Sequence, residues 1–125
     1  MYQVAYQQEH KIEIVLSDVV TTDEFQQVIH QLESLAKAHQ HLNVLIDAVD
    51  VKSFGAKVMW EQYEFFKNYK SHLQRLAVVS DSSMHKKIQE LFFKFTDTEF
   101  RLYSSDELEK ARAWIFPSRL PKDIT

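Results

Sequence analysis

Three aspartates are the first residues whose type and position could support chemistry. Asp47 and Asp50 follow the apolar run 42–46, and Asp81 follows the apolar run 76–79. If both runs are parallel strands, these carboxylates lie near the edge of the sheet where open α/β folds bind ligands. There they could bind a metal ion or share acid–base work. We favour structural roles, because Asp81 stands where a helix N-cap is expected and such a cap contributes about 1 kcal/mol.

Further polar residues follow Asp81 directly. Ser82, Ser83 and His85 fall at the expected start of a helix, where hydroxyls and backbone amides could hold an anion. The same region allows a second interpretation, a small hydrolase or isomerase in which Asp47, Asp81 and His85 transfer protons. No base or orienting residue for either serine is visible, so a serine-nucleophile triad has no support.

Composition removes most other chemistries. The 125 residues include no cysteine and one glycine, Gly55, which excludes thiolate nucleophiles, Cys-ligated metals, P-loops and dinucleotide fingerprints. The six histidines have no evident set of converging partners, so we expect no metal and no cofactor. A net charge of −3 argues against nucleic acid as a partner. No apolar run reaches the roughly 20 residues of a membrane span, and no signal-peptide pattern is present, so we expect a cytoplasmic protein.

The elements that must position these residues alternate between strands and helices. Period-two patterns predict a hairpin of two strands, at 2–7 and 11–17, and the two apolar runs predict strands covered on both faces. A last strand is expected at 99–103. Helices are expected after the hairpin and after each later strand, at 21–39, 55–73, 84–95 and from Ser104 or Ser105 to about 115.

This order, β-β-α-β-α-β-α-β-α, predicts an α/β fold. The expected architecture is a single domain with a five-stranded mixed sheet covered by four helices, with the hairpin strand antiparallel at one edge. The side chains expected to be buried are Ile14, Leu32, Val44, Ile46, Val78, Val79, Ile88 and Trp114.

The helix predicted at 55–73 is apolar over an unusually wide arc. One stripe consists of Met59, Tyr63, Phe66 and Leu73, and a second of Val58, Phe65 and Tyr69. A surface helix normally needs one such stripe, so this helix is expected to contact something besides the sheet. The expected wall of an apolar ligand site consists of Trp60, Tyr63, Phe66 and Phe92. A plain aromatic core, or an interface in a homodimer, would explain the same stripes.

Five segments carry a family resemblance through their order and spacing: 45–47, 54–55, 76–81, 99–103 and 111–115. Together they look like the SpoIIAA-like family, a branch of the STAS (anti-sigma-factor antagonist) fold. The resemblance spans about residues 2–116 and implies a domain at 1–116 followed by a C-terminal tail at 117–125. It also implies a five-stranded sheet with four helices, no established catalytic residues, and a suggested role in binding apolar small molecules.

One feature of the regulatory relatives is missing. Anti-sigma-factor antagonists carry a phosphorylatable serine in an Asp-Ser-small-Gly turn after the middle strand, whereas here Ser53 lies near that place without the motif. The residues and the resemblance therefore predict a non-catalytic binding domain, with an apolar small molecule as its ligand. The alternatives are a STAS-type regulatory module that binds another protein and, less favoured, the enzyme based on Asp47, Asp81 and His85.

Overall fold

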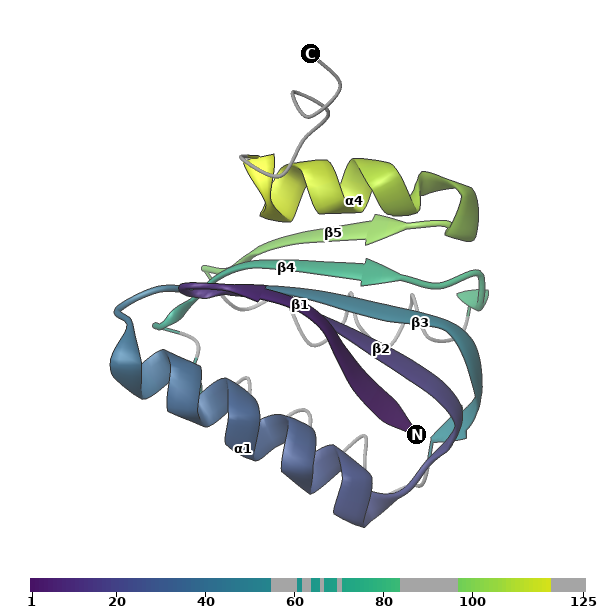
Figure 1. The fold of residues 1–125 in the computed structure, drawn as a ribbon, viewed down its shortest axis with the longest axis horizontal. Coiled ribbons are helices and arrows are strands. Elements are labelled where there is room, and N and C mark those ends of the chain that lie inside the picture. Colours follow the sequence, from purple (N-terminus) through teal and green to yellow (C-terminus); the bar gives the residue numbers. More distant parts are fainter. Residues whose placement is uncertain (55–60, 62–63, 66, 70, 84–96, 118–125) are drawn as a thin grey trace.

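A five-stranded sheet in the order β1-β2-β3-β4-β5 organises the chain (Figure 1). This computed structural model describes residues 1–54, 61, 64–65, 67–69, 71–83 and 97–117. The strands are β1 (Tyr2–Gln8), β2 (Lys11–Val20), β3 (Leu42–Phe54), β4 (Leu73–Val79) and β5 (Glu99–Tyr103). β1 pairs antiparallel with β2, and each later strand pairs parallel with the strand before it. The predicted mixed sheet with an antiparallel hairpin strand at its edge is therefore confirmed.

Three helices fall within the described residues, rather than the four expected. They are α1 (Thr22–Ala38), the 3-10 helix η1 (Ser105–Glu107) and α4 (Leu108–Ile115). Of the helix predicted at 55–73, the described residues 61, 64–65 and 67–69 are helical. The helix predicted at 84–95 lies outside the described residues.

Local sequence explains where α1 and η1 begin. The Thr21 hydroxyl accepts a hydrogen bond from the backbone N–H of Glu24 at 3.2 Å, which satisfies one of the free donors of the first turn of α1. At η1, the backbone N–H of Ser104 donates to Oε1 of Glu107 at 3.0 Å. Both N-terminal signals predicted from the sequence are thus used.

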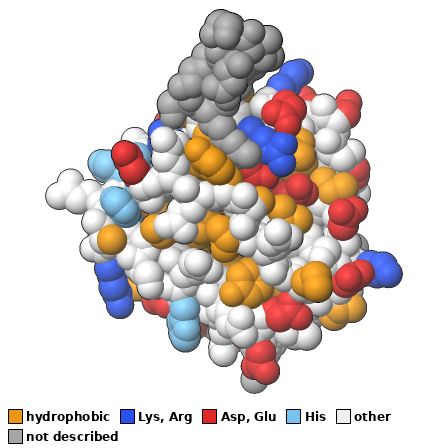
Figure 2. All heavy atoms as spheres, viewed as in Figure 1, with side chains coloured by type: hydrophobic (Ala, Val, Ile, Leu, Met, Phe, Trp, Pro, Cys, Tyr) orange, Lys and Arg blue, Asp and Glu red, His pale blue; other side chains and the backbone are white. Residues whose placement is uncertain are grey.

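The sheet is covered on both faces, by α1 on one side and α4 on the other (Figure 1). In the same view, Figure 2 shows hydrophobic side chains over the middle of this side of the molecule and charged side chains mostly around its rim. Alternate residues of a strand point to opposite faces. On β3, Val44 and Ile46 accordingly pack in the α1 core, whereas Leu45 packs in the α4 core. All three are buried. The prediction that this strand is central and doubly covered is confirmed.

Three local predictions were wrong. Trp114 is only partly buried, because its indole packs at the margin of the α4 core, where the guanidinium carbons of Arg75 and Arg101 lie 5.1 and 4.5 Å from the ring centre. Leu73 begins β4 instead of closing a helix. Asp47 lies inside β3 and not at its end, because β3 continues to Phe54.

The long β3 has a simple cause. Beyond Asp47, it no longer pairs with β4 but continues to pair with β2, from Ser17 opposite Asp50 to Val20 opposite Phe54. Register shifts interrupt this pairing, and Asp18 adopts a positive φ of 56° next to one of them. The two strands therefore extend past the rest of the sheet as a bent ribbon.

Candidate functional site

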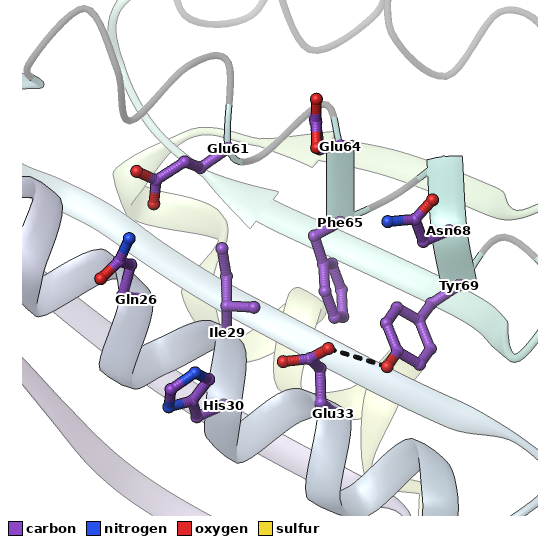
Figure 3. Close-up of a pocket in the computed structure, with 9 residues that line it drawn as sticks. All are labelled: Gln26, Ile29, His30, Glu33, Glu61, Glu64, Phe65, Asn68 and Tyr69. Carbon is purple, nitrogen blue, oxygen red and sulfur yellow. Dashed lines mark hydrogen bonds between the residues drawn. The ribbon is translucent and has the colours of Figure 1, made fainter.

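A pocket of about 350 Å³ lies between α1 and the helical residues that follow β3 (Figure 3). We call it the α1 pocket. Its wall on α1 consists of Gln26, Ile29, His30 and Glu33. The opposite wall, which we call the 61–69 wall, consists of Glu61, Glu64, Phe65, Asn68 and Tyr69.

Helical periodicity explains how α1 supplies its part of the pocket. The lining positions 26, 29, 30 and 33 recur at spacings of three and four residues, so they share one face of the helix. A neighbouring face, with Phe25, Val28 and Leu32, is buried against the sheet. α1 thus packs its apolar face on the sheet and presents a mostly polar flank to the pocket.

The apolar part of the pocket is provided by two rings of the 61–69 wall. Phe65 is 5% exposed and belongs to the α1 core. It stacks on Tyr69 with ring centres 5.0 Å apart and ring planes 25° apart. Ile29 faces the two rings from α1 (Figure 3). An apolar ligand group would contact these three side chains.

One hydrogen bond joins the two walls. The Tyr69 hydroxyl donates to Oε2 of Glu33 at 2.8 Å, and Figure 3 shows this bond closing one end of the pocket. The bond raises the pKa of Tyr69 above its ordinary value, because the phenol would lose a charged acceptor on deprotonation; burial and the Glu33 charge act in the same direction.

The carboxylates give the pocket its electrostatic character. Glu33, Glu61 and Glu64 line it, and the described lining residues include no lysine or arginine. Oε2 of Glu61 is buried and has no hydrogen-bond partner in the described part of the chain. Figure 3 shows the Glu61 side chain directed toward α1 and that of Glu64 directed away from it. Glu61 and Glu33 are therefore the acidic groups that a ligand would meet.

The residues predicted to form an apolar wall are not tested by this geometry. Trp60, Tyr63, Phe66 and Phe92 all lie outside the described residues, as does His85.

The predicted polar site after β4 is partly described. Oδ1 of Asp81 accepts a hydrogen bond from the backbone N–H of Ser105 at 2.9 Å, so this carboxylate fastens the end of β4 to the start of η1. The backbone N–H of Ser82 donates to the Ser80 hydroxyl at 3.1 Å. Ser83 is exposed. The bond to Ser105 gives Asp81 a structural role other than the predicted N-cap, whose helix lies outside the described residues.

Asp47 lies on the face of the sheet that α4 covers. Its Oδ1 accepts a hydrogen bond from the backbone N–H of Val49 at 3.2 Å. Burial raises the pKa of the Asp47 carboxyl above its ordinary value, and the nearby carboxylates of Glu13 and Asp50 raise it further, against the opposing effects of the Val49 bond and Arg112.

Next to Asp47 lies a charged pair that the sequence did not reveal. Glu13 of β2 is fully buried, and its carboxylate binds the Arg112 guanidinium of α4, with Nη2 2.9 Å from Oε2. Glu13 is buried beneath α4 and Arg112 is partly exposed, so the first role of the pair is to hold α4 on the sheet. Within the described residues, no group of three histidine, aspartate or glutamate side chains could hold a metal ion, and no helix is long and apolar enough to cross a membrane.

The α1 pocket was not predicted as a site, although two of its residues carried a signal. Phe65 and Tyr69 form the second apolar stripe of the predicted 55–73 helix, and Glu61 lies one turn before Phe65 on the same face. A carboxylate in line with one buried ring and one partly buried ring is unusual for a face that packs on a core. Glu33 and Tyr69 are 36 residues apart in the chain, so no local sequence pattern predicts the hydrogen bond between them.

Comparisons with known proteins agree on the fold. The SpoIIAA-like family profile matches residues 11–116. The structure of an uncharacterized protein from the DUF3478 family of Shewanella loihica PV-4, which has a SpoIIAA-like fold, is 17% identical, with 92% of each chain covered and a TM-score of 0.70.

The anti-sigma factor antagonist SpoIIAA in its unphosphorylated form is 11% identical, with 90% of this chain and 98% of that chain covered and a TM-score of 0.56. None of the curated proteins matches. At these identities the two structures show a shared fold, while the family profile covers most of the sequence. The chain therefore belongs to the SpoIIAA-like family.

Proposed function

We propose that this SpoIIAA-like domain is a non-catalytic binding domain for a small molecule with an apolar group, and that the α1 pocket holds that group. The observation that carries the proposal is the pocket itself. Its volume of about 350 Å³ falls in the usual range for small-molecule sites, which combine an apolar lining with a few polar groups. Phe65, Tyr69 and Ile29 supply the apolar lining, and the α1 flank supplies polar groups.

The wall predicted from the sequence remains part of this proposal. Trp60, Tyr63, Phe66 and Phe92 were expected to form the apolar wall of a ligand site. Their role in binding stays a prediction, because all four lie outside the described residues.

The described carboxylates support a non-catalytic role. Asp47 and Asp81 each accept a hydrogen bond from a backbone N–H, and Glu33 accepts one from Tyr69. General acid–base catalysis needs a titratable group placed against a reacting atom, and the contacts of these three carboxylates have sufficient structural explanations. The enzyme based on Asp47, Asp81 and His85 is accordingly the weakest of the three candidates.

The test uses three probes with the same eight-carbon chain: 1-octanol, octylamine and octanoate. Each is titrated into the ¹⁵N-labelled protein and followed by amide chemical shifts. We expect at least one probe to shift the amides around the α1 pocket. Asn68→Trp places a large ring at the exposed pocket edge and should abolish those shifts, whereas Gln40→Trp, which changes an exposed amide away from the pocket, should preserve them. The proposal fails if no probe shifts the amides around the pocket, or if Asn68→Trp leaves those shifts unchanged.

A STAS-type regulatory module that binds another protein is the second candidate. Similarity to the anti-sigma factor antagonist SpoIIAA favours it. The region that would carry a regulatory serine differs, because Ser53 lies within β3, paired with Val19 of β2. Native mass spectrometry of the protein from its own cells separates the candidates. A small added mass supports the pocket, a stoichiometric second protein supports the module, and a doubled mass of this chain supports a homodimer.

A further inference from the structure

The α1 pocket combines apolar side chains with the carboxylates of Glu33 and Glu61. This combination restricts the chemistry of its ligand. We propose that the polar end of the ligand is a protonated amine, bound by Glu61 and Glu33, so that the ligand class is a small amphipathic amine. The inference rests on the proposed function, because it names the ligand chemistry of the same pocket.

The first argument is the unsatisfied oxygen of Glu61. Buried polar atoms in folded proteins almost always have a hydrogen-bond partner, and an exception calls for an explanation. Oε2 of Glu61 is buried without one in the described part of the chain. Figure 3 shows the carboxylate directed toward Gln26, yet no hydrogen bond joins them. A bound ammonium group would supply both a donor and a positive charge that no described residue gives this oxygen.

The second argument is the sign of the charge. Neither Glu61 nor Glu33 forms an ion pair with a lysine or arginine of the described residues. Glu33 uses Oε2 for the Tyr69 hydroxyl, and Figure 3 shows its other oxygen turned toward the His30 side of the pocket. Two carboxylates in one partly desolvated pocket favour a cation and repel a fatty acid.

The third argument selects an organic cation over a metal ion. No three described carboxylates or histidines are grouped closely enough to hold a metal. The pocket volume of about 350 Å³ far exceeds the size of a bare ion. The Phe65 and Tyr69 rings would contact the apolar part of an amine and could also attract its charged end through their π faces.

The three eight-carbon probes test this inference at low and moderate salt. We expect octylamine to bind at least about tenfold more tightly than octanol, octanoate to bind more weakly than octanol, and added salt to weaken the amine alone. Glu61→Gln should weaken octylamine by about tenfold while changing octanol less than about twofold. Glu99→Gln makes the same charge change at an exposed position of β5, away from the pocket, and should leave all three affinities unchanged.

The outcomes separate this inference from the proposed function. The inference of an amine ligand is refuted if octanol or octanoate binds as tightly as octylamine, or if Glu61→Gln leaves octylamine binding unchanged. In either case the pocket remains the binding site. Absence of binding by all three probes would overturn both. If Glu61→Gln does not fold, as judged by its amide spectrum, Glu33→Gln takes its place and must weaken octylamine selectively.

Discussion

Arg112 should contribute far more to stability than an exposed cation on the same helix, because it neutralises a carboxylate with no access to water. Glu13 is 0% exposed and Arg112 is 27% exposed. The guanidinium Nε lies 3.1 and 3.2 Å from the two carboxylate oxygens of Glu13, and Nη2 lies 2.9 Å from Oε2. Replacing Arg112 with methionine keeps much of the apolar stem but removes every one of these bonds.

The size of the effect follows from this geometry. Breaking a buried ion pair by removing one partner costs about 3–5 kcal/mol, because the remaining charge stays buried. Arg112 is partly exposed, so some water would reach Glu13 in the variant, and we expect the lower end, about 3 kcal/mol. For a domain of 125 residues, 1 kcal/mol shifts the melting temperature by about 4 °C, which gives a loss of roughly 12 °C.

Urea and thermal unfolding followed by circular dichroism measure this loss. Lys110→Met is the matched control, because Lys110 lies on α4, is 75% exposed and pairs with Glu107 at 3.8 Å; it should lose at most about 0.5 kcal/mol. The double variant Glu13→Leu with Arg112→Met removes both charges and should return to within about 1 kcal/mol of the parent. A loss below about 1 kcal/mol in Arg112→Met, or a double variant no more stable than that single one, would refute the reasoning.

Three further predictions concern single side chains. Burial raises the pKa of Asp47, so its contribution to stability is complete below its unfolded pKa and is lost as the pH rises through its folded pKa. Asp47→Asn, which keeps the acceptor for Val49, should therefore raise the melting temperature at pH 7 and not below pH 4; a lower value at pH 7 would contradict this. Thr21→Ala should cost about 1 kcal/mol of unfolding free energy through the lost α1 cap, and Thr21→Ser should cost little; equal losses would exclude the cap as the cause. Glu33→Gln should lower the pKa of Tyr69 in an NMR titration, because the hydroxyl then meets an uncharged acceptor; an unchanged pKa would rule out this hydrogen bond in solution.

Patterns local to each segment were enough to predict the sheet. Ile12 and Ile14 follow the two-residue period of a strand, whereas the continuous apolar run ending at Ile46 is typical of a strand covered on both faces. The capping residues Thr21 and Ser104 likewise act within three positions of themselves. These features are visible in sequence because the physical cause and its effect lie in the same short segment.

Local sequence patterns did not predict interactions between residues that are far apart in the chain. Glu13 alternates with two isoleucines and resembles a solvent-facing residue of a strand, but α4 covers it and Arg112 pairs with it from 99 positions away. Asp47 was expected at a strand end, because nothing in the sequence shows that β3 continues to pair with β2 after β4 stops. Only the packed elements reveal which charges are buried.

The position of the α1 pocket follows from the strand order. β2, β3 and β4 are neighbours in the sheet in the same order as in the chain. The connection from β2 to β3 contains α1, and the connection from β3 to β4 contains the 61–69 wall. The Tyr69 to Glu33 bond places both connections on one face of the sheet, side by side.

Parallel strands joined in sequence put successive crossovers next to each other, so a groove between two helical connections is a direct product of this topology. Whether the groove is filled or open then depends on a few side chains. Here polar and acidic residues lie between α1 and the 61–69 wall, at positions where two tightly packed helices would have apolar residues. The pocket therefore lies between the crossovers and away from the strand ends that hold Asp81. A fold shared with an anti-sigma factor antagonist can in this way carry a site made by its own crossover residues, which the fold alone does not specify.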